Sequence, residues 1–93
     1  MAGEPDFVFP SHVYYTDVDG QMVLLNLESE EYFGLDEVGS NIVTRLTEQS
    51  WDRALTDLID YYEVDPEVLR RDIDDLVKKL LTAGLLMRSK PTD

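Results

Sequence analysis

The chain has no cysteine and only one histidine, His12, among its 93 residues. Without cysteine it can form no disulfide framework, no zinc–thiolate site and no cysteine nucleophile. A single histidine leaves no imidazole cluster for a metal and little basis for an acid–base relay. We therefore expect no metal site, no cofactor and no catalytic constellation, and we expect that the protein is not an enzyme.

Basic residues are also few. Eight Lys and Arg stand against twenty Asp and Glu, which gives a formal net charge of −12. Because attraction to phosphate supplies most non-specific affinity for nucleic acids, this balance argues against DNA or RNA as a partner. It favours solubility and basic or neutral partners, although an acidic surface is also common where it serves solvation alone.

Long apolar runs are absent as well. No run approaches the ~18 residues that a membrane-spanning helix needs. The first residues also lack the basic-then-apolar pattern of a secretion signal. We therefore expect a cytoplasmic protein.

The first half of the chain has the pattern of three antiparallel strands. A run rich in β-branched and aromatic residues, 12–18, ends at Asp19–Gly20, and a second run follows at 21–27. Asp-Gly between two such runs predicts a tight hairpin, because both turn positions tolerate positive φ. The second run is apolar on both faces. A short acidic turn then leads to a third run, 31–35, which completes a three-stranded meander.

Three helices are predicted in the second half, each beginning after a residue that can cap its first turn. These residues are Asp36, Ser50 and Asp65, and Asp65 is followed by Pro66 at the first helical position. Gly84 gives the third helix a natural C-terminal stop. A three-stranded antiparallel sheet followed by three helices, with short connections, predicts an α+β domain with the outline of a winged helix-turn-helix.

The chain divides into three parts on this pattern. Residues 1–11 form an N-terminal arm that Phe7 and Phe9 could hold on the domain, residues 12–88 form the domain, and residues 89–93 form a C-terminal tail.

The third helix, 67–83, is expected to bury one stripe of side chains and to expose a flank on either side. At about 100° per residue, the buried stripe consists of Leu69, Ile73, Leu76 and Leu80. One flank carries Val68, Asp72, Asp75 and Lys79, with Leu76 on its border. The other flank carries Val77 and Leu81.

The third strand of a meander is a sheet edge with unpaired N–H and C=O groups. Charges blunt this edge only at Glu30 and Glu31, because "YFGL" is uncharged and free of proline, and Gly34 would let another backbone approach. The edge could therefore take up an extended peptide as a fourth strand, in a groove against the third helix. The sequence leaves an alternative equally open, in which the third helix or the N-terminal arm covers the edge.

Two aromatic rings stand side by side in this strand, at Tyr32 and Phe33. Neighbouring residues in a strand point to opposite faces, so one core cannot bury both rings. We expect Phe33, with Leu35, to belong to the core, and Tyr32 to lie on the other face near the groove.

Several local patterns suggest chemistry but lack the rest of their motif. "DVDG" begins like a calcium-binding loop but has no terminal glutamate, and Asp72 and Asp75 favour a solvated helix face over a metal site. Ser40 lies in the first helix without the preceding aspartate of an acyl carrier, and no base adjoins it in the sequence.

The segment "EEYFGLDEVGSNIVTRL" resembles the PqqD-like family, in which a strand reading roughly Tyr-x-Leu-Asn precedes a helix with Gly and an Ile-aromatic pair. The positions that match or substitute conservatively are Tyr32, Leu35, Asp36, Gly39 and Ile42. The preceding hairpin and the later Asp-Pro-opened helix agree in order and length, so the resemblance runs from about His12 to Arg88. The departures are Asp36 for the usual Asn, Val43 for a frequent Trp, and the Phe33–Gly34 pair.

Members of this family are RiPP recognition elements, which bind the leader segment of a ribosomally made precursor peptide. The chain looks most like the stand-alone leader-binding protein of a lasso-peptide pathway in antibiotic biosynthesis, where a separate leader peptidase and a cyclase do the chemistry. The resemblance implies that the leader lies antiparallel along the third strand. For the strand, the residues implied are Glu31, Tyr32, Phe33, Gly34 and Leu35.

The helix wall of the groove is assigned to Val68, Asp72, Asp75, Leu76 and Lys79. The opposite flank, with Val77 and Leu81, is the alternative wall. Two alternative functions share the same architecture. One is a winged-helix DNA-binding regulator, which the net charge disfavours, and the other is a general protein–protein adaptor that uses the same edge.

Overall fold

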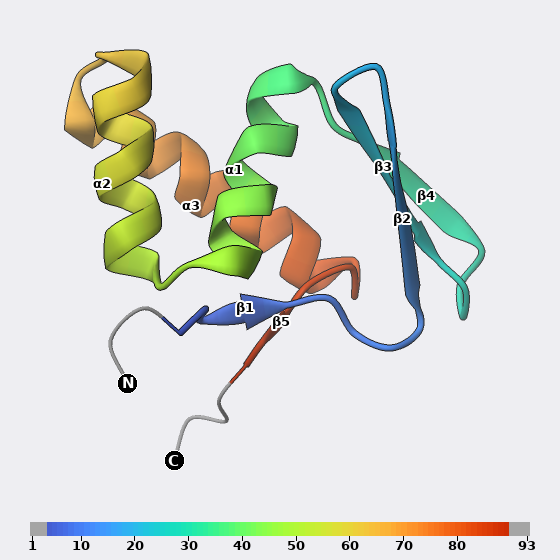
Figure 1. Ribbon diagram of the computed structural model, residues 1–93. Helices are drawn as coiled ribbons and strands as arrows, with labels where there is room; N and C mark the ends of the chain where they lie inside the picture. Colours follow the sequence, from blue (N-terminus) through green and yellow to red (C-terminus); the bar gives the residue numbers. More distant parts are fainter. Residues whose placement is uncertain (1–3, 90–93) are drawn as a thin grey trace.

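The computed structural model describes residues 4–89. The three predicted strands are β2 (Val13–Val18), β3 (Gln21–Asn26) and β4 (Glu31–Gly34), and they form an antiparallel sheet in the order β2-β3-β4. The three predicted helices follow as α1 (Glu37–Glu48), α2 (Trp51–Tyr62) and α3 (Pro66–Thr82). The expected α+β, winged-helix-like architecture is therefore confirmed (Figure 1).

Local signals set the ends of these elements. Asp19 and Gly20 both have positive φ, 55° and 83°, as a tight hairpin between β2 and β3 requires. The side chains of Asp36, Ser50 and Asp65 each accept a hydrogen bond from a backbone N–H in the first turn of α1, α2 and α3. All three predicted caps are confirmed, and each helix begins at the residue after its cap.

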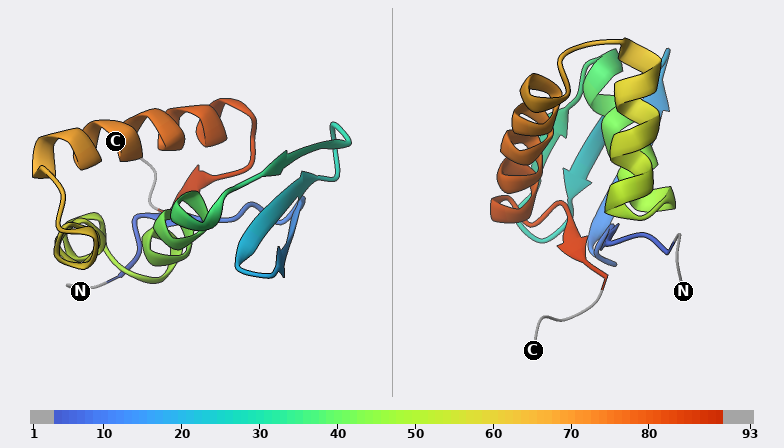
Figure 2. Two further views of the ribbon diagram at one scale, coloured as in Figure 1. Left: turned by 90° about the horizontal axis from the view of Figure 1, so that it is seen from above. Right: turned by 90° about the vertical axis from the view of Figure 1, so that its left-hand side faces the viewer.

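The helices cover one face of the three-stranded sheet and leave the other face open (Figures 1 and 2). Side chains from both layers meet in one core, in which Leu24, Leu46, Leu58, Ile73 and Leu80 are almost fully buried. Val77 of α3 is buried as well, whereas Leu76 is only partly buried. The buried stripe of α3 is thus rotated toward Val77 from its expected position, because other elements pack against that flank.

A second, two-stranded sheet brings the two ends of the described chain together. β1 (Phe7–Val8) pairs antiparallel with β5 (Met87–Arg88), and Phe7 is buried in the core. The Ser89 N–H donates to the carbonyl of Asp6 at 2.9 Å. We call this pair of strands the terminal ribbon. The sequence patterns did not predict this pairing. The division into arm, domain and tail stays a prediction, with residues 1–3 of the arm and residues 90–93 of the tail outside the described chain.

Candidate functional site: the β4 edge and α3

β4 is an edge strand whose backbone points outward at two residues. Within the described chain it pairs only with β3, with Phe33 opposite Leu24 and Tyr32 opposite Leu25. The Leu35 N–H donates to the Met22 carbonyl at 2.8 Å, so this amide points toward β3. Because backbone groups of an antiparallel strand alternate in direction, those of Phe33 also face β3, while the N–H and C=O of Tyr32 and Gly34 face away from the sheet.

The two aromatic rings of β4 lie on opposite faces. Phe33 is partly buried against the core and Leu35 is buried, whereas 78% of Tyr32 is exposed. The expected division between the rings is confirmed. A Cβ added at Gly34 would meet nothing within 4 Å, so no contact in the described chain requires glycine at this position.

Asn26 joins the β3–β4 turn to the end of α3. Its Nδ2 donates to the Ala83 carbonyl at 3.1 Å, and its Oδ1 accepts from the N–H groups of Glu28 at 2.9 Å and Ser29 at 3.2 Å. The side chain is only 6% exposed, so all three bonds lie away from most solvent. Asn26 therefore holds the start of β4 at a set position relative to the C-terminus of α3.

His12 and Gly84 reinforce the same junction. His12 Nε2 lies 3.0 Å from the Gly84 carbonyl oxygen and donates to it. Gly84 has a φ of 72°, and a Cβ there would lie 3.1 Å from Asn26 Nδ2. Glycine is needed at this position both for the backbone conformation and for the close approach of Asn26.

Ser40 fixes the other end of β4. The Met22 N–H donates to Ser40 Oγ at 2.6 Å, and the Ser40 hydroxyl lies 3.4 Å from the Leu35 carbonyl oxygen. Ser40 is 4% exposed, so its hydroxyl links α1 to the sheet and is not accessible for attachment of a carrier group. The buried polar residues Asn26 and Ser40 thus position both ends of the edge strand.

The helix residues predicted for the groove lie on an open face of α3. Val68, Asp72, Asp75 and Lys79 are exposed, and Leu76 is partly buried at the border of the core. α3 begins beside α2, on the side of the domain away from the sheet, and its C-terminal half approaches the sheet (Figures 1 and 2). Leu76 and Lys79 therefore lie on the half of the helix nearer β4, and Val68 lies at its remote end. That these residues form one groove with β4 stays a prediction.

The opposite flank of α3 has a different environment. Val77 and Leu81 line a cavity together with Phe7 and Arg88 of the terminal ribbon and Trp51 of α2. The terminal ribbon and α2 therefore adjoin this flank, while the flank with Asp72 faces solvent.

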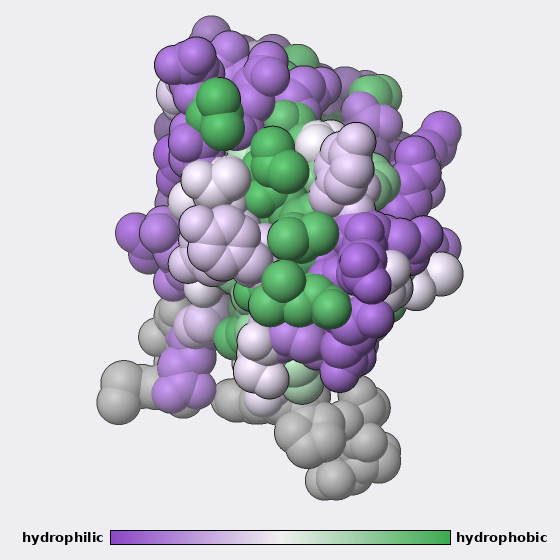
Figure 3. Space-filling view, turned by 90° about the vertical axis from the view of Figure 1, so that its right-hand side faces the viewer, coloured by the Kyte–Doolittle hydropathy of each residue, from purple (hydrophilic) through white to green (hydrophobic). Residues whose placement is uncertain are grey.

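The outer face of the sheet is a second feature of the surface. Tyr14, Val18, Leu27 and Tyr32 are all more than half exposed there, and Val23 and Leu25 lie between them. Figure 3 shows a band of hydrophobic side chains on this side of the molecule, with hydrophilic ones on either side. The sequence patterns were not interpreted as predicting this surface. The second predicted strand, 21–27, is apolar on both faces, and its second apolar face indicated an exposed hydrophobic surface.

The described residues contain neither a candidate metal site nor a candidate membrane-spanning helix. No group of three or more His, Cys, Asp or Glu side chains between residues 4 and 89 could hold a metal ion. Over the same residues, none of the helices combines the length and the hydropathy that crossing a bilayer demands.

Comparisons with known proteins agree with the fold described above. Residues 21–86 match the PqqD family, described as coenzyme PQQ synthesis protein D. The chain is similar to the structure of TbiB1 in complex with the TbiA(beta) leader peptide, with 30% identity, a TM-score of 0.79, and coverage of 92% of this chain and 99% of that one. It is also similar to a lasso peptide synthetase B1 complexed with the leader peptide, with 31% identity, a TM-score of 0.80, and coverage of 88% and 98%.

No curated protein matches the chain significantly. The match over residues 21–86 takes in all of β3, β4 and the three helices, and thus every element of the candidate site. The chain belongs to the PqqD family.

Proposed function

We propose that this protein binds the leader segment of a lasso-peptide precursor, without catalysis, by adding the leader as a fourth strand to β4. The observation that carries the proposal is the outward-facing backbone of Tyr32 and Gly34 on an edge that is unpaired in the described chain. The two similar structures are both complexes with a leader peptide, which supports the same kind of ligand here.

Strand addition alone gives little selectivity. Each backbone hydrogen bond contributes only about 0.5–1.5 kcal/mol net, so side-chain contacts must distinguish one leader from another. We assign that role to the exposed ring of Tyr32 and to the α3 face with Leu76, Asp72 and Asp75. An apolar residue beside two carboxylates suits a leader with apolar anchors and basic residues.

Hydrogen exchange tests the strand addition residue by residue. In the free protein, the amides of Tyr32 and Gly34 should exchange rapidly, and those of Phe33 and Leu35 should be protected because they face β3. A saturating leader should slow exchange at Tyr32 and Gly34 roughly 10-fold or more, with little change at Phe33 and Leu35.

The same complex reports on the α3 wall. Methyl signals of Leu76 should shift on leader binding, while those of Leu81, on the flank that lines the cavity, should not. A leader that binds without slowing exchange at Tyr32 and Gly34 would rule out strand addition to β4. Shifts at Leu81 in place of Leu76 would instead move the groove to the other flank.

Delivery of the leader to a peptidase and a cyclase needs a second surface, and we assign docking of the peptidase to the outer face of the sheet. A leader antiparallel to β4 would run from Gly34 toward Glu31, so the segment to be processed would leave beside Leu27 and Tyr32. The apolar outer face lies at that exit. Its flanking turns carry exposed acidic residues, including Asp19 and Glu30, which disfavour a second copy of this chain and favour a partner with basic residues.

A charge on the outer face should separate docking from leader binding. Leu27→Lys should leave leader affinity within about twofold but reduce the leader peptidase's cleavage of the precursor roughly 10-fold, because a cation would be buried at an apolar interface. Val64→Lys is the matched control, since Val64 is 44% exposed and lies between α2 and α3, away from the sheet. Full cleavage of the precursor with the Leu27 variant would rule out the outer face as the docking surface for the peptidase.

A further inference from the structure

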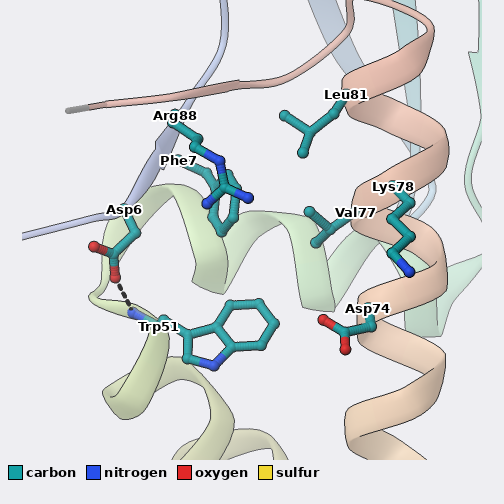
Figure 4. Close-up of a pocket in the computed structure, with 8 residues that line it drawn as sticks. All are labelled: Asp6, Phe7, Trp51, Asp74, Val77, Lys78, Leu81 and Arg88. Atoms are coloured by element: carbon teal, nitrogen blue, oxygen red, sulfur yellow. Dashed lines mark hydrogen bonds between the residues drawn. The ribbon is translucent and has the colours of Figure 1, made fainter. Parts of the chain in front are cut away.

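A cavity of about 470 Å³ lies on the side of α3 that faces α2 and the terminal ribbon (Figure 4). Its apolar surface comes from Phe7, Trp51, Val77 and Leu81, and Arg88 and Lys78 also line it. This volume lies in the range of cavities that hold small ligands. The leader-binding site proposed above uses none of these residues.

Two aromatic rings in the wall of this cavity contact each other, and one of them also contacts Arg88. The rings of Phe7 and Trp51 meet edge to face with centroids 6.1 Å apart, and the Arg88 guanidinium carbon lies 5.5 Å from the centroid of Phe7. Figure 4 shows the Arg88 guanidinium across the ring of Phe7, with the indole of Trp51 beside them. The guanidinium is thus placed beside an aromatic surface on which a flat apolar group could stack.

Neither cation of the cavity has an acidic partner among residues 4–89. Neither Lys78 nor Arg88 forms an ion pair within 4.0 Å of any described residue, although the chain has twenty acidic residues and eight basic ones. The carboxylate of Asp6, which also lines the cavity, accepts the backbone N–H of Trp51 at 2.6 Å and so serves the start of α2. Asp6 and Asp74, which lies one turn before Lys78, are the two acidic side chains that oppose an anion here.

We propose that this cavity binds a carboxylate carried on an aromatic or aliphatic body, with the carboxylate on Arg88 and the body against Trp51, Val77 and Leu81, while Lys78 adds positive charge at the opposite rim. A free aromatic acid and the C-terminal residue of a peptide share this chemistry. Planar guanidinium groups bind carboxylates through paired hydrogen bonds, and the rings supply apolar contact area.

The chain carries its own reporter for this site, since Trp51 is the one tryptophan in the sequence. N-acetylphenylalanine should shift the Trp51 indole N–H signal in NMR spectra with a Kd on the order of 1 mM, as expected for a ligand of this size. N-acetylphenylalaninamide, which lacks the carboxylate, should bind at least fivefold more weakly, because it loses roughly one charge-assisted hydrogen bond. Acetyl-Gly-Gly-Phe with a free C-terminus tests the peptide source, because tighter binding than the single residue would indicate contacts along a peptide.

Substitutions should change this affinity in opposite directions. Arg88→Gln should weaken binding of N-acetylphenylalanine roughly fivefold, while Asp74→Asn should strengthen it about twofold by removing a like charge. Arg71→Gln is the matched control, because it removes one positive charge from an exposed position of α3 outside the cavity. NMR spectra of the free variants check that each one folds.

Two results would overturn the proposal. One is no Trp51 shift with N-acetylphenylalanine at about ten times the expected Kd, and the other is equal binding of the acid and the amide. Leader binding is measured in a separate titration of the same samples. Failure at the cavity would therefore leave the β4 proposal intact, and failure at β4 would leave the cavity proposal intact.

Discussion

Gly34→Pro should strongly weaken leader binding while the domain stays folded. The Gly34 N–H faces away from β3, so proline removes a group that no strand of the described chain uses, and proline is tolerated on edge strands in that orientation. The ring would also occupy the space that an added strand needs. We expect a loss of roughly 100-fold in leader affinity, from a missing hydrogen bond combined with a steric block.

Gly34→Ala is the matched control for this variant. It keeps the N–H, and its Cβ would meet nothing within 4 Å, so we expect leader affinity within about twofold of the original chain. Isothermal titration with each variant measures the difference, and thermal unfolding checks the fold. If both variants lose binding, glycine itself is needed for close approach of the leader. If both keep it, the leader does not pair with β4.

Asn26→Ala should be the most destabilising of the polar substitutions considered. It removes one donor and one acceptor that together serve Ala83, Glu28 and Ser29 in a side chain 6% exposed. Leaving these backbone groups without partners should reduce the free energy of unfolding by about 2–4 kcal/mol. For a domain of this size the melting temperature should fall by roughly 10–25 °C.

Asn41→Ala serves as the control, because Asn41 makes its hydrogen bonds to the side chains of Tyr62 and Arg45 instead of to a turn. It should reduce the free energy of unfolding by no more than about 1 kcal/mol. Calorimetry of the two variants provides the comparison. Equal stability of both would mean that the Asn26 junction does not hold β4 and α3 together.

Much of the fold could be predicted because its signals are local. The caps Asp36, Ser50 and Asp65 each bond to an N–H within three residues, and the Asp19–Gly20 turn depends on backbone preferences of those two residues alone. The placement of Phe33 and Tyr32 on opposite faces follows from strand geometry in the same way. Such features need no knowledge of distant parts of the chain.

The remaining features depend on partners far away in the sequence. The hydrogen-bond partner of Asn26 Nδ2 is Ala83, 57 residues away in the sequence. Val77 is buried because the terminal ribbon and α2 pack against its flank of α3. No pattern within β1, which is only two residues long, indicates that Phe7 will pair with Arg88. Only a bound leader can show whether β4 and α3 together form one binding groove. The hydrogen exchange and methyl-shift experiments on the leader complex test this.

The terminal ribbon has a consequence for how the domain can be connected to other proteins. Because Asp6 and Ser89 are joined by a hydrogen bond, the described chain leaves the fold at nearly the same point where it enters. A domain with adjacent ends can be inserted whole into a loop of another protein, or be closed into a circular permutant, without separating its strands. A fused enzyme would then be attached at the terminal ribbon, and the β4 edge and the outer face of the sheet would both stay free to act.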